Sequence, residues 1–267
     1  MIILLLFPYL AVVFTVGTLP VKERAGQMSP LEIYVCQITA GTLPADSADE
    51  FIKAQMVLVR TNAVREMQEQ LQNPVENLLD IKSIEERFGD RLYRLAKETE
   101  GQILMHEGVP IEGAYHAVSN GKTRDGREVL GESMPYLVPV ECPEDLRSPE
   151  YLYRTEILVE QRGSDPESGG VKWNKVEVLE RDSSGYVQRV KFGEELLTGE
   201  QFRERLGLCS SDFIIEEAED AIIITTKGLG HGLGMSQYTA NHMAQNGAEY
   251  REILATFFPG TDLTKIE

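Results

Sequence analysis

The spacing of apolar residues divides the chain into a helical first part and a later part rich in short strands. Up to about residue 101 the apolar residues recur at helical intervals, and glycine or proline ends each pattern. The first such segment begins at Leu31, and a long second one ends before Asn73-Pro74. The predicted helices therefore cover residues 31–41, 48–72 and 83–101.

From residue 103 onward, short apolar runs broken by glycine, proline and Asn-Gly pairs predict strands and hairpins. One hairpin is predicted around the turn sequence ERDSSG, and a second leads from Asp212 into a glycine-rich run. Helical patterns return at 198–208, 236–247 and 248–258. We therefore expect an α+β fold: a single intertwined domain with N-terminal helices, a central strand and hairpin region, and C-terminal helices.

An uncharged apolar segment opens the chain, because no charged residue occurs from Ile2 to Leu19. Its length is close to the roughly 20 residues of a membrane span and exceeds the roughly 7–15 residues of a signal-peptide core. We expect an apolar helix at 1–19 that is a membrane anchor or uncleaved signal, a tether at 20–29 and one domain over 30–267. Basic residues follow the segment and none precedes it, against the usual rule for export, so a cytoplasmic protein with a buried N-terminal helix is the alternative.

The composition narrows the function classes only in part. The formal net charge of −17 argues against nonspecific nucleic-acid binding, which requires a cationic surface. The cysteines Cys36, Cys142 and Cys209 are widely spaced and form no disulfide framework, so buried thiols are expected. His116 and Cys142 are too far apart in sequence to predict a metal site, and we expect no metal and no cofactor.

Four glycines alternate with other residues in the run GLGHGLG, which begins at Gly228 and holds His231 at its centre. No Gly-Lys-Ser/Thr ends the run, so it is not a phosphate-binding P-loop, and no βαβ unit with a ribose-binding acid surrounds it. The run lies at a strand–loop–helix junction, where loop amides and a helix N-terminus can donate hydrogen bonds. A tight turn whose histidine bonds to the backbone is the alternative at this point.

The C-terminal stretch GLGHGLGMSQYTANHMAQNGAEYREILATFFPGT resembles the signature of the sporulation stage II protein D/LytB family. The stretch LEIYVCQITAGTLPADSADEFIKAQMVLVRTNAVRE resembles the family's N-terminal motif, and SNGKT, MPYLVPVE and GEQFRERLGLCSSDF resemble its middle. The resemblance runs from about Pro30 to Thr261. It implies an anchored protein that faces the cell wall or septal space, acts on peptidoglycan glycan strands, and has a wall amidase as a second candidate partner.

The resemblance also implies a reaction. Sporulation members of the family are lytic transglycosylases, which cut between N-acetylmuramic acid and N-acetylglucosamine and leave a 1,6-anhydro end. One carboxylic acid gives a proton to the glycosidic oxygen and then, as a carboxylate, accepts one from the sugar's 6-hydroxyl. In the family motif this acid is the glutamate of a tetrapeptide EMPA, which aligns here with Thr42-Leu43-Pro44-Ala45.

The candidate site residues follow from this alignment. Thr42 cannot replace the acid, because a hydroxyl is far too weak an acid. Glu50 matches another glutamate of the motif and is the candidate catalytic acid, although its simpler role is a favourable interaction with the helix dipole. The implied substrate contacts lie in the glycine run and the helix after it, where glycines would give clearance for sugars: His231, Gly232, Ser236, Gln237 and Tyr238.

Two function hypotheses follow from the sequence. The first is an active lytic transglycosylase that uses Glu50 or another acid. The second is a catalytically weakened member that binds glycan strands, or assists an amidase, without cutting. Whether the protein is an enzyme stays open at this point, because the family's acid position holds Thr42.

Overall fold

The computed structural model describes residues 28–69, 80–131, 134–158, 176–218 and 221–266. The predicted apolar helix at 1–19 lies outside these residues. Within them, eight α-helices and several small sheets confirm the α+β class. None of the helices in this described part is both long and apolar enough to cross a membrane.

Residue contacts divide the chain into two compact units, each assembled from separate stretches of sequence. Unit 1 holds the described residues up to Gly113, together with 243–255 and 260–266. Unit 2 holds 114–242 and 256–259. Each unit is described by itself below, and the expectation of one domain over 30–267 stays a prediction.

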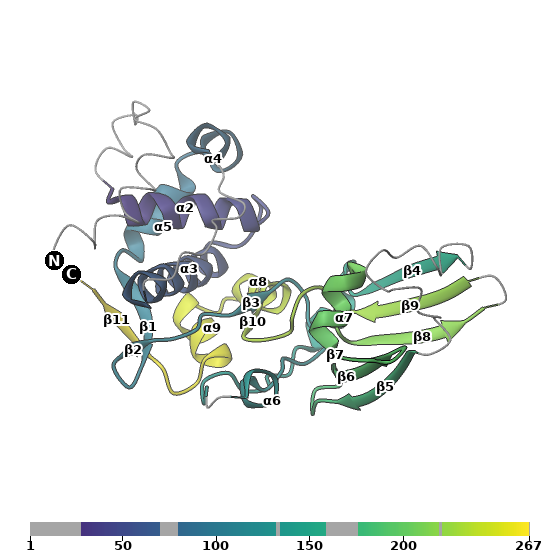
Figure 1. The fold of residues 1–267 in the computed structure, drawn as a ribbon. Coiled ribbons are helices and arrows are strands. Elements are labelled where there is room, and N and C mark those ends of the chain that lie inside the picture. Colours follow the sequence, from purple (N-terminus) through teal and green to yellow (C-terminus); the bar gives the residue numbers. More distant parts are fainter. Residues whose placement is uncertain (1–27, 70–79, 132–133, 159–175, 219–220, 267) are drawn as a thin grey trace. The chain divides into compact units, whose positions relative to one another are not determined.

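Two helices form the centre of unit 1 (Figure 1). Helix α2 (Pro30–Thr42) begins after Ser29, whose hydroxyl accepts a hydrogen bond from Glu32 N–H at 3.3 Å. Helix α3 (Asp49–Glu69) packs against α2 and confirms the long helix that the sequence predicts. Their contact buries apolar side chains that include Val35, Cys36, Ile52, Met56 and Leu58.

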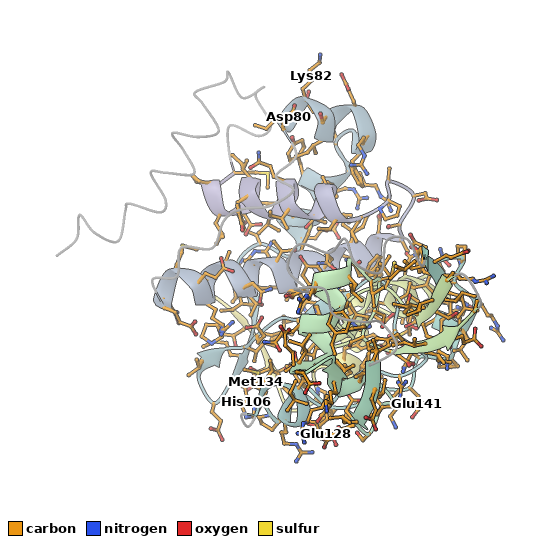
Figure 2. All side chains as sticks on the ribbon, turned by 45° about the vertical axis from the view of Figure 1, so that its right-hand side comes forward. Asp80, Lys82, His106, Glu128, Met134 and Glu141 are labelled. Atoms are coloured by element: carbon orange, nitrogen blue, oxygen red, sulfur yellow. The ribbon has the colours of Figure 1, made fainter. Side chains whose placement is uncertain are left out.

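The single polar helix predicted over 83–101 was wrong, because the structure has two helices there. They are α4 (Ile81–Phe88) and α5 (Arg91–Glu98). Asp80 caps the start of α4, where Figure 2 labels it, by accepting a hydrogen bond from Ser83 N–H at 3.1 Å. Gly89 ends α4 with a φ of +56°, a conformation that glycine adopts without steric cost and that interrupts the helical pattern.

A three-stranded antiparallel sheet completes unit 1. The strands β1 (Gln102–His106) and β2 (Val109–Pro110) form a hairpin, which confirms that the short apolar runs from residue 103 onward form strands. The other edge of the sheet is β11 (Asp262–Lys265), which pairs Leu263 with Leu104. This last strand was not predicted, because four mainly polar residues carry too little alternation to indicate a strand.

A buried ion pair joins the elements of unit 1. Arg60 on α3 donates to both carboxylate oxygens of Glu32 on α2, at 2.7 and 2.6 Å, and both side chains are almost fully buried. Arg60 also donates to the Gln102 carbonyl at 3.0 Å, and the Gly101 N–H donates to Glu32 at 3.3 Å. Because removing one partner of such a pair costs about 3–5 kcal/mol, this pair fixes α2, α3 and the start of β1 together.

Two three-stranded sheets pack face to face in unit 2, with α7 (Gly199–Leu206) at one end (Figure 1). One sheet has the order β4-β9-β8, with the strands Leu152–Leu158, Ala221–Lys227 and Phe213–Glu217. The other has the order β5-β6-β7, with the strands Val176–Arg181, Val187–Phe192 and Glu195–Thr198. Both predicted hairpins are confirmed, and the core between the sheets includes Phe192, Phe202, Phe213, Ile222 and Ile224.

The rest of unit 2 surrounds the glycine-rich run. Strand β3 (Tyr115–His116) pairs in parallel with β10 (Met235–Ser236), and helix α8 (Gln237–Gln245) follows β10 directly. The helix α6 (Gly126–Leu130) and a 3-10 helix (Pro143–Arg147) lie between β3 and β4 in the sequence. The three predicted C-terminal helices are confirmed as α7, α8 and α9 (Tyr250–Phe257).

Candidate functional site

Thr42 is the last residue of α2, and its hydroxyl bonds back to its own helix. The Oγ1 atom lies 3.1 Å from the Ile38 carbonyl and 3.2 Å from the Thr39 carbonyl, to which it donates. The following residue, Leu43, is extended and ends the helix. The hydroxyl therefore satisfies carbonyl groups at a helix end, which otherwise have no partner within the helix.

Glu50 lies in the first turn of α3, and its side chain is 30% exposed. Its carboxylate forms an ion pair with Lys53 and accepts a hydrogen bond from Tyr250 N–H, the first residue of α9, at 2.9 Å. Burial disfavours the charge on Lys53, but its bonds to Glu50 and Glu98 outweigh this and raise the pKa of Lys53. Both contacts use the carboxylate oxygens of Glu50, which a general acid would have to present to the substrate.

The four alternating glycines of the loop face the protein's own chain. Each has a positive φ, between +66° and +114°. A Cβ at Gly228 would lie 2.6 Å from the Val118 carbonyl oxygen, and one at Gly234 would lie 2.1 Å from the Ala114 carbonyl oxygen. The segment around β3 occupies the space beside Gly228, Gly230 and Gly234, and Tyr186 and Arg124 occupy the space beside Gly232. Clearance for sugars at this loop stays a prediction.

Arg124 holds the middle of the loop in place. Its backbone N–H donates to the Gly232 carbonyl at 2.8 Å, and its guanidinium donates to the His231 carbonyl at 3.2 Å. The same guanidinium is almost fully buried and pairs with Asp182 at 2.6 Å and Glu200 at 2.7 Å. Because a buried arginine needs such partners, the loop and these two carboxylates form one connected polar network.

The electrostatics of this network favour the charged form of Glu200. Burial disfavours the charge on Glu200, but hydrogen bonds from Ser211 and Arg203 and the nearby arginines outweigh this, so the pKa of Glu200 lies below its ordinary value. Arg124 also lies 4.8 Å from the centre of the Tyr186 ring, in a cation–π contact. The charged groups that fix the loop, Arg124, Asp182 and Glu200, therefore all lie outside the loop itself.

Two histidines meet beside the loop, with Leu233 between them. The Leu233 N–H donates to His231 Nδ1 at 3.1 Å, and the Leu233 carbonyl accepts from His116 Nδ1 at 3.0 Å. The ring centres are 5.8 Å apart in an edge contact. Burial, followed by repulsion from His231, lowers the pKa of His116 to about 3, and burial also lowers the pKa of His231. Both imidazoles are therefore neutral at pH 7.

Asp145, from the 3-10 helix, joins the start of α8 to β3 and the segment after it. It is fully buried and accepts four hydrogen bonds. Two come from the N–H and hydroxyl of Ser119, at 2.7 and 2.5 Å, one from Ser236 at 2.8 Å and one from Thr239 at 2.7 Å. Burial and the charge of Asp145 raise the pKa of the neighbouring Cys142 thiol to about 12. A carboxylate with this many donors acts as a fixed anchor for the loop–helix junction.

Comparisons with known proteins agree with the resemblance seen in the sequence. A family model described as SpoIID: Stage II sporulation protein matches residues 22–106. Stage II sporulation protein D of Bacillus subtilis (strain 168) is 31% identical over 277 residues, which cover 94% of this chain and 80% of that protein. The protein of the same name from Bacillus amyloliquefaciens is 30% identical, over 89% of this chain and 75% of that protein.

The chain belongs to the stage II sporulation protein D family. A more distant similarity is to the amidase enhancer of Bacillus subtilis (strain 168), at 24% identity over 83% of this chain and 39% of that protein. The amidase enhancer represents the LytB branch of the family. The resemblance to the SpoIID/LytB family is therefore confirmed.

The substrate contacts implied by the SpoIID resemblance are brought together in unit 2, at the loop and the start of α8. His231, Gln237 and Tyr238 are partly exposed. Gly232 and Ser236 are buried, and the Ser236 hydroxyl is bonded to Asp145. Substrate contact stays a prediction for all five, but the exposed three have the surface that such a contact requires.

Thr42 and Glu50 lie in unit 1, and a catalytic role for Glu50 stays a prediction. Sequence reasoning missed Asp145 and Arg124, because the elements that surround them come from distant parts of the chain. Within the described ranges, no group of three or more histidine, cysteine, aspartate or glutamate side chains could hold a metal ion. Cys36 and Cys142 are buried free thiols as expected, and Cys209 is a partly exposed one.

Proposed function

We propose that this SpoIID-family protein takes part in sporulation-related remodelling of the cell wall by binding peptidoglycan glycan strands without cutting them. The observation that supports the proposal is Thr42, whose hydroxyl donates to its own helix and which, by the resemblance to the family's motif, takes the position of the acid. A general acid contributes roughly 10²–10⁴-fold to a rate, so its loss leaves little turnover. The connected network around the glycine loop supports retained binding, because it fixes the partly exposed surface of His231, Gln237 and Tyr238.

The second candidate function is lytic transglycosylase activity with Glu50 as the acid. Its partial exposure favours this reading, since a buried carboxylate could not reach a glycosidic oxygen. The ion pair with Lys53 and the bond from Tyr250 N–H weigh against it, because both occupy the carboxylate oxygens with which an acid would contact the glycosidic oxygen.

One experiment separates the two functions. The chain is incubated with glycan strands stripped of stem peptides, and both co-sedimentation and release of 1,6-anhydro ends are measured. We expect co-sedimentation of the wild type and no release above a protein-free control. If the wild type cuts and Glu50→Gln abolishes cutting in a folded variant, Glu50 is the acid and the binding-only proposal is wrong. If it cuts and Glu50→Gln has no effect, another acid acts and both proposals are wrong.

We also propose that the apolar segment at 1–19 anchors the protein in the membrane, with the remainder facing the wall. The uncharged run from Ile2 to Leu19 and the family membership support this. Protease added to intact protoplasts should degrade the part of the chain after Pro30. Full protection of that part would contradict this location.

The similarity to the amidase enhancer supports a further role for the bound protein, as a helper of a wall amidase. Such a role needs no acid, because the partner enzyme performs the cleavage. Adding the chain to a wall amidase acting on intact peptidoglycan should then raise the rate of stem-peptide release. An unchanged rate would remove the amidase as a partner.

A further inference from the structure

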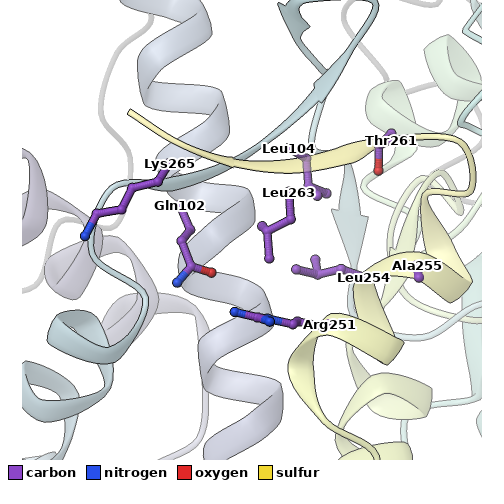
Figure 3. Close-up of a pocket in the computed structure, with 8 residues that line it drawn as sticks. All are labelled: Gln102, Leu104, Arg251, Leu254, Ala255, Thr261, Leu263 and Lys265. Atoms are coloured by element: carbon purple, nitrogen blue, oxygen red, sulfur yellow. The ribbon is translucent and has the colours of Figure 1, made fainter. Parts of the chain in front are cut away.

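A pocket of about 430 Å³ opens in unit 1 between the strands β1 and β11 and the helix α9 (Figure 3). One part of its lining is apolar, from Leu104, Leu254 and Leu263. The other part carries polar side chains, and Figure 3 shows Gln102, Arg251 and Lys265 gathered at one end of the pocket. A pocket of this size with an apolar part and a few polar groups is typical of a small-ligand site.

The shape of the pocket follows from the sheet and the helix that form it. Leu104 and Leu263 are paired residues on adjacent strands, so their side chains lie on the same face of the sheet. Leu254 on α9 is 2% exposed and supplies the opposite wall. The apolar part therefore belongs to the packed core of unit 1 and does not depend on a mobile loop.

One edge of the Arg251 guanidinium is hydrogen-bonded within unit 1, and its outer edge faces the pocket. Its Nε donates to the Tyr250 hydroxyl at 3.0 Å, and that hydroxyl donates in turn to the Gln102 side-chain oxygen at 2.9 Å. No residue in the described part of the chain bonds to the two outer nitrogens of Arg251 or to the Lys265 amine. Nearby carboxylates bond elsewhere but lie within electrostatic range of the two cations. The bond from Lys97 at 2.6 Å lowers the pKa of Glu100, and the charge of Lys265 adds a smaller contribution. The charge of Glu249 acts on Arg251 in the same way, and Glu252 accepts the Glu249 N–H at 2.9 Å.

Two cations at one end of a single pocket are unusual in a chain with a net charge of −17. The outer edge of a guanidinium matches a carboxylate, to which it donates two parallel hydrogen bonds. The leucines beside it favour a ligand whose carboxylate adjoins an apolar group. The chemistry of the pocket therefore selects a small organic acid with a methyl or similar group next to the carboxylate.

We propose that this pocket binds the lactyl group of N-acetylmuramic acid, with the carboxylate on Arg251 and Lys265 and the lactyl methyl against the leucines. The proposal rests on the proposed function, because it takes the ligand from a glycan strand. Strands stripped of stem peptides expose this carboxylate on every muramic residue, whereas in peptide-bearing strands it forms an amide bond. The pocket would thus let the protein distinguish stripped strands from peptide-bearing ones.

The pocket also adjoins the predicted acid within unit 1. Glu50 accepts a hydrogen bond from the N–H of Tyr250, the residue before Arg251. Two cations contact the Tyr250 ring, with Lys53 5.2 Å and Arg251 5.5 Å from its centre. A muramic residue held by Arg251 would therefore lie close to the start of α3.

The test is a titration of the 267-residue chain, kept in mild detergent, with N-acetylmuramic acid, its methyl ester and N-acetylglucosamine, followed by calorimetry. We expect N-acetylmuramic acid to bind at least tenfold more tightly than the other two. Arg251→Gln should weaken its binding at least tenfold, and Lys265→Gln should weaken it severalfold. The matched control is Lys82→Gln, since Lys82 is an 84% exposed cation on α4 (Figure 2) and its loss should change nothing.

Three results would overturn the proposal: no binding of N-acetylmuramic acid at millimolar concentration, equal binding of its ester, or an effect of Arg251→Gln no larger than that of Lys82→Gln. Binding of the dipeptide L-alanyl-D-glutamate in place of N-acetylmuramic acid would assign the pocket to a stem peptide and overturn the lactyl assignment. Co-sedimentation with stripped strands separates this proposal from the proposed function. If the wild type and Arg251→Gln sediment equally well, only the pocket proposal fails. If neither sediments but N-acetylmuramic acid still binds through Arg251, the proposed function fails and the carboxylate site remains.

Discussion

The glycine loop of unit 2 and the end of α2 in unit 1 both lie in stretches that resemble the family's motifs, and their polar groups form different kinds of contact. Around the loop, Arg124 and Asp145 bond to residues more than 80 positions away in the sequence. At the end of α2, the Thr42 hydroxyl donates to the carbonyl groups of the residues three and four positions before it. The scaffold of the loop is thus tied into the fold, whereas Thr42 carries local contacts that many side chains could replace.

This difference separates what maintains the fold from what performs chemistry. Replacing a residue in the loop network disturbs several elements at once, so such positions resist change. Replacing the acid of an active site disturbs the reaction and leaves the fold intact. A protein that keeps the loop network and lacks the catalytic acid is suited to binding without cutting.

The largest effect is expected from Gly234→Ala. Its Cβ would meet the Ala114 carbonyl oxygen at 2.1 Å, and its φ of +66° is strained for alanine, so the free energy of unfolding should fall by about 3 kcal/mol or more. Gly207→Ala is the matched control, because its φ is +61° and no atom lies within 4 Å of its Cβ. The control should cost only about 1 kcal/mol in chemical denaturation. Equal costs would mean that the loop is not tightly packed on β3.

A second large effect is expected from Asp145→Ala. Three hydroxyls and one amide lose their shared acceptor in a fully buried place, which should cost about 3 kcal/mol. The neighbouring Glu144→Ala removes an ion pair to Arg147 on the same 3-10 helix and a 3.6 Å contact with His242 on α8, both at the surface, and should cost no more than about 1 kcal/mol. Thermal unfolding of the two variants side by side measures the difference. Similar melting temperatures would show that Asp145 is not the anchor of α8.

A smaller, pH-dependent effect is expected at His116. Its pKa of about 3 in the folded protein lies below the ordinary value of 6.5, so below pH 6.5 the unfolded chain binds a proton that the folded chain does not. Stability is therefore lost as the pH falls from 6.5 towards 3, by about 1–2 kcal/mol at pH 5 from this group. His116→Asn keeps a donor for the Leu233 carbonyl and removes this loss. Parallel stability curves for wild type and variant between pH 7 and 5 would contradict this account.

Much of the fold could be predicted from the sequence because its signals are local. The Thr198 cap and Gln201 predict α7, and the turn at Gly185 joins the strands of a confirmed hairpin. The break at Gly89 and the strand β11 were missed for opposite reasons. Glycine permits several conformations, so position 89 alone does not predict a break, and β11 exists only because β1 offers it an edge.

The candidate site was less accessible to sequence reasoning. The glycine run indicated close approach, but whether a ligand or the chain itself fills the space depends on β3, which lies about 115 residues earlier. A single buried aspartate such as Asp145 looks like any surface aspartate in the sequence, because its three hydroxyl donors come from two distant segments. Long-range hydrogen bonds of this kind have no periodic signal.

The central claim is that the family scaffold lacks its acid because Thr42 has replaced it, and one measurement tests it most directly. Glycan strands stripped of stem peptides are incubated with the wild type, Thr42→Glu and the matched control Thr42→Gln, and the 1,6-anhydro ends are counted. We predict that the wild type and Thr42→Gln release none above background, whereas Thr42→Glu raises the rate by roughly 10²–10⁴-fold over the wild-type level. Robust release by the wild type, with no increase in Thr42→Glu, would contradict the claim.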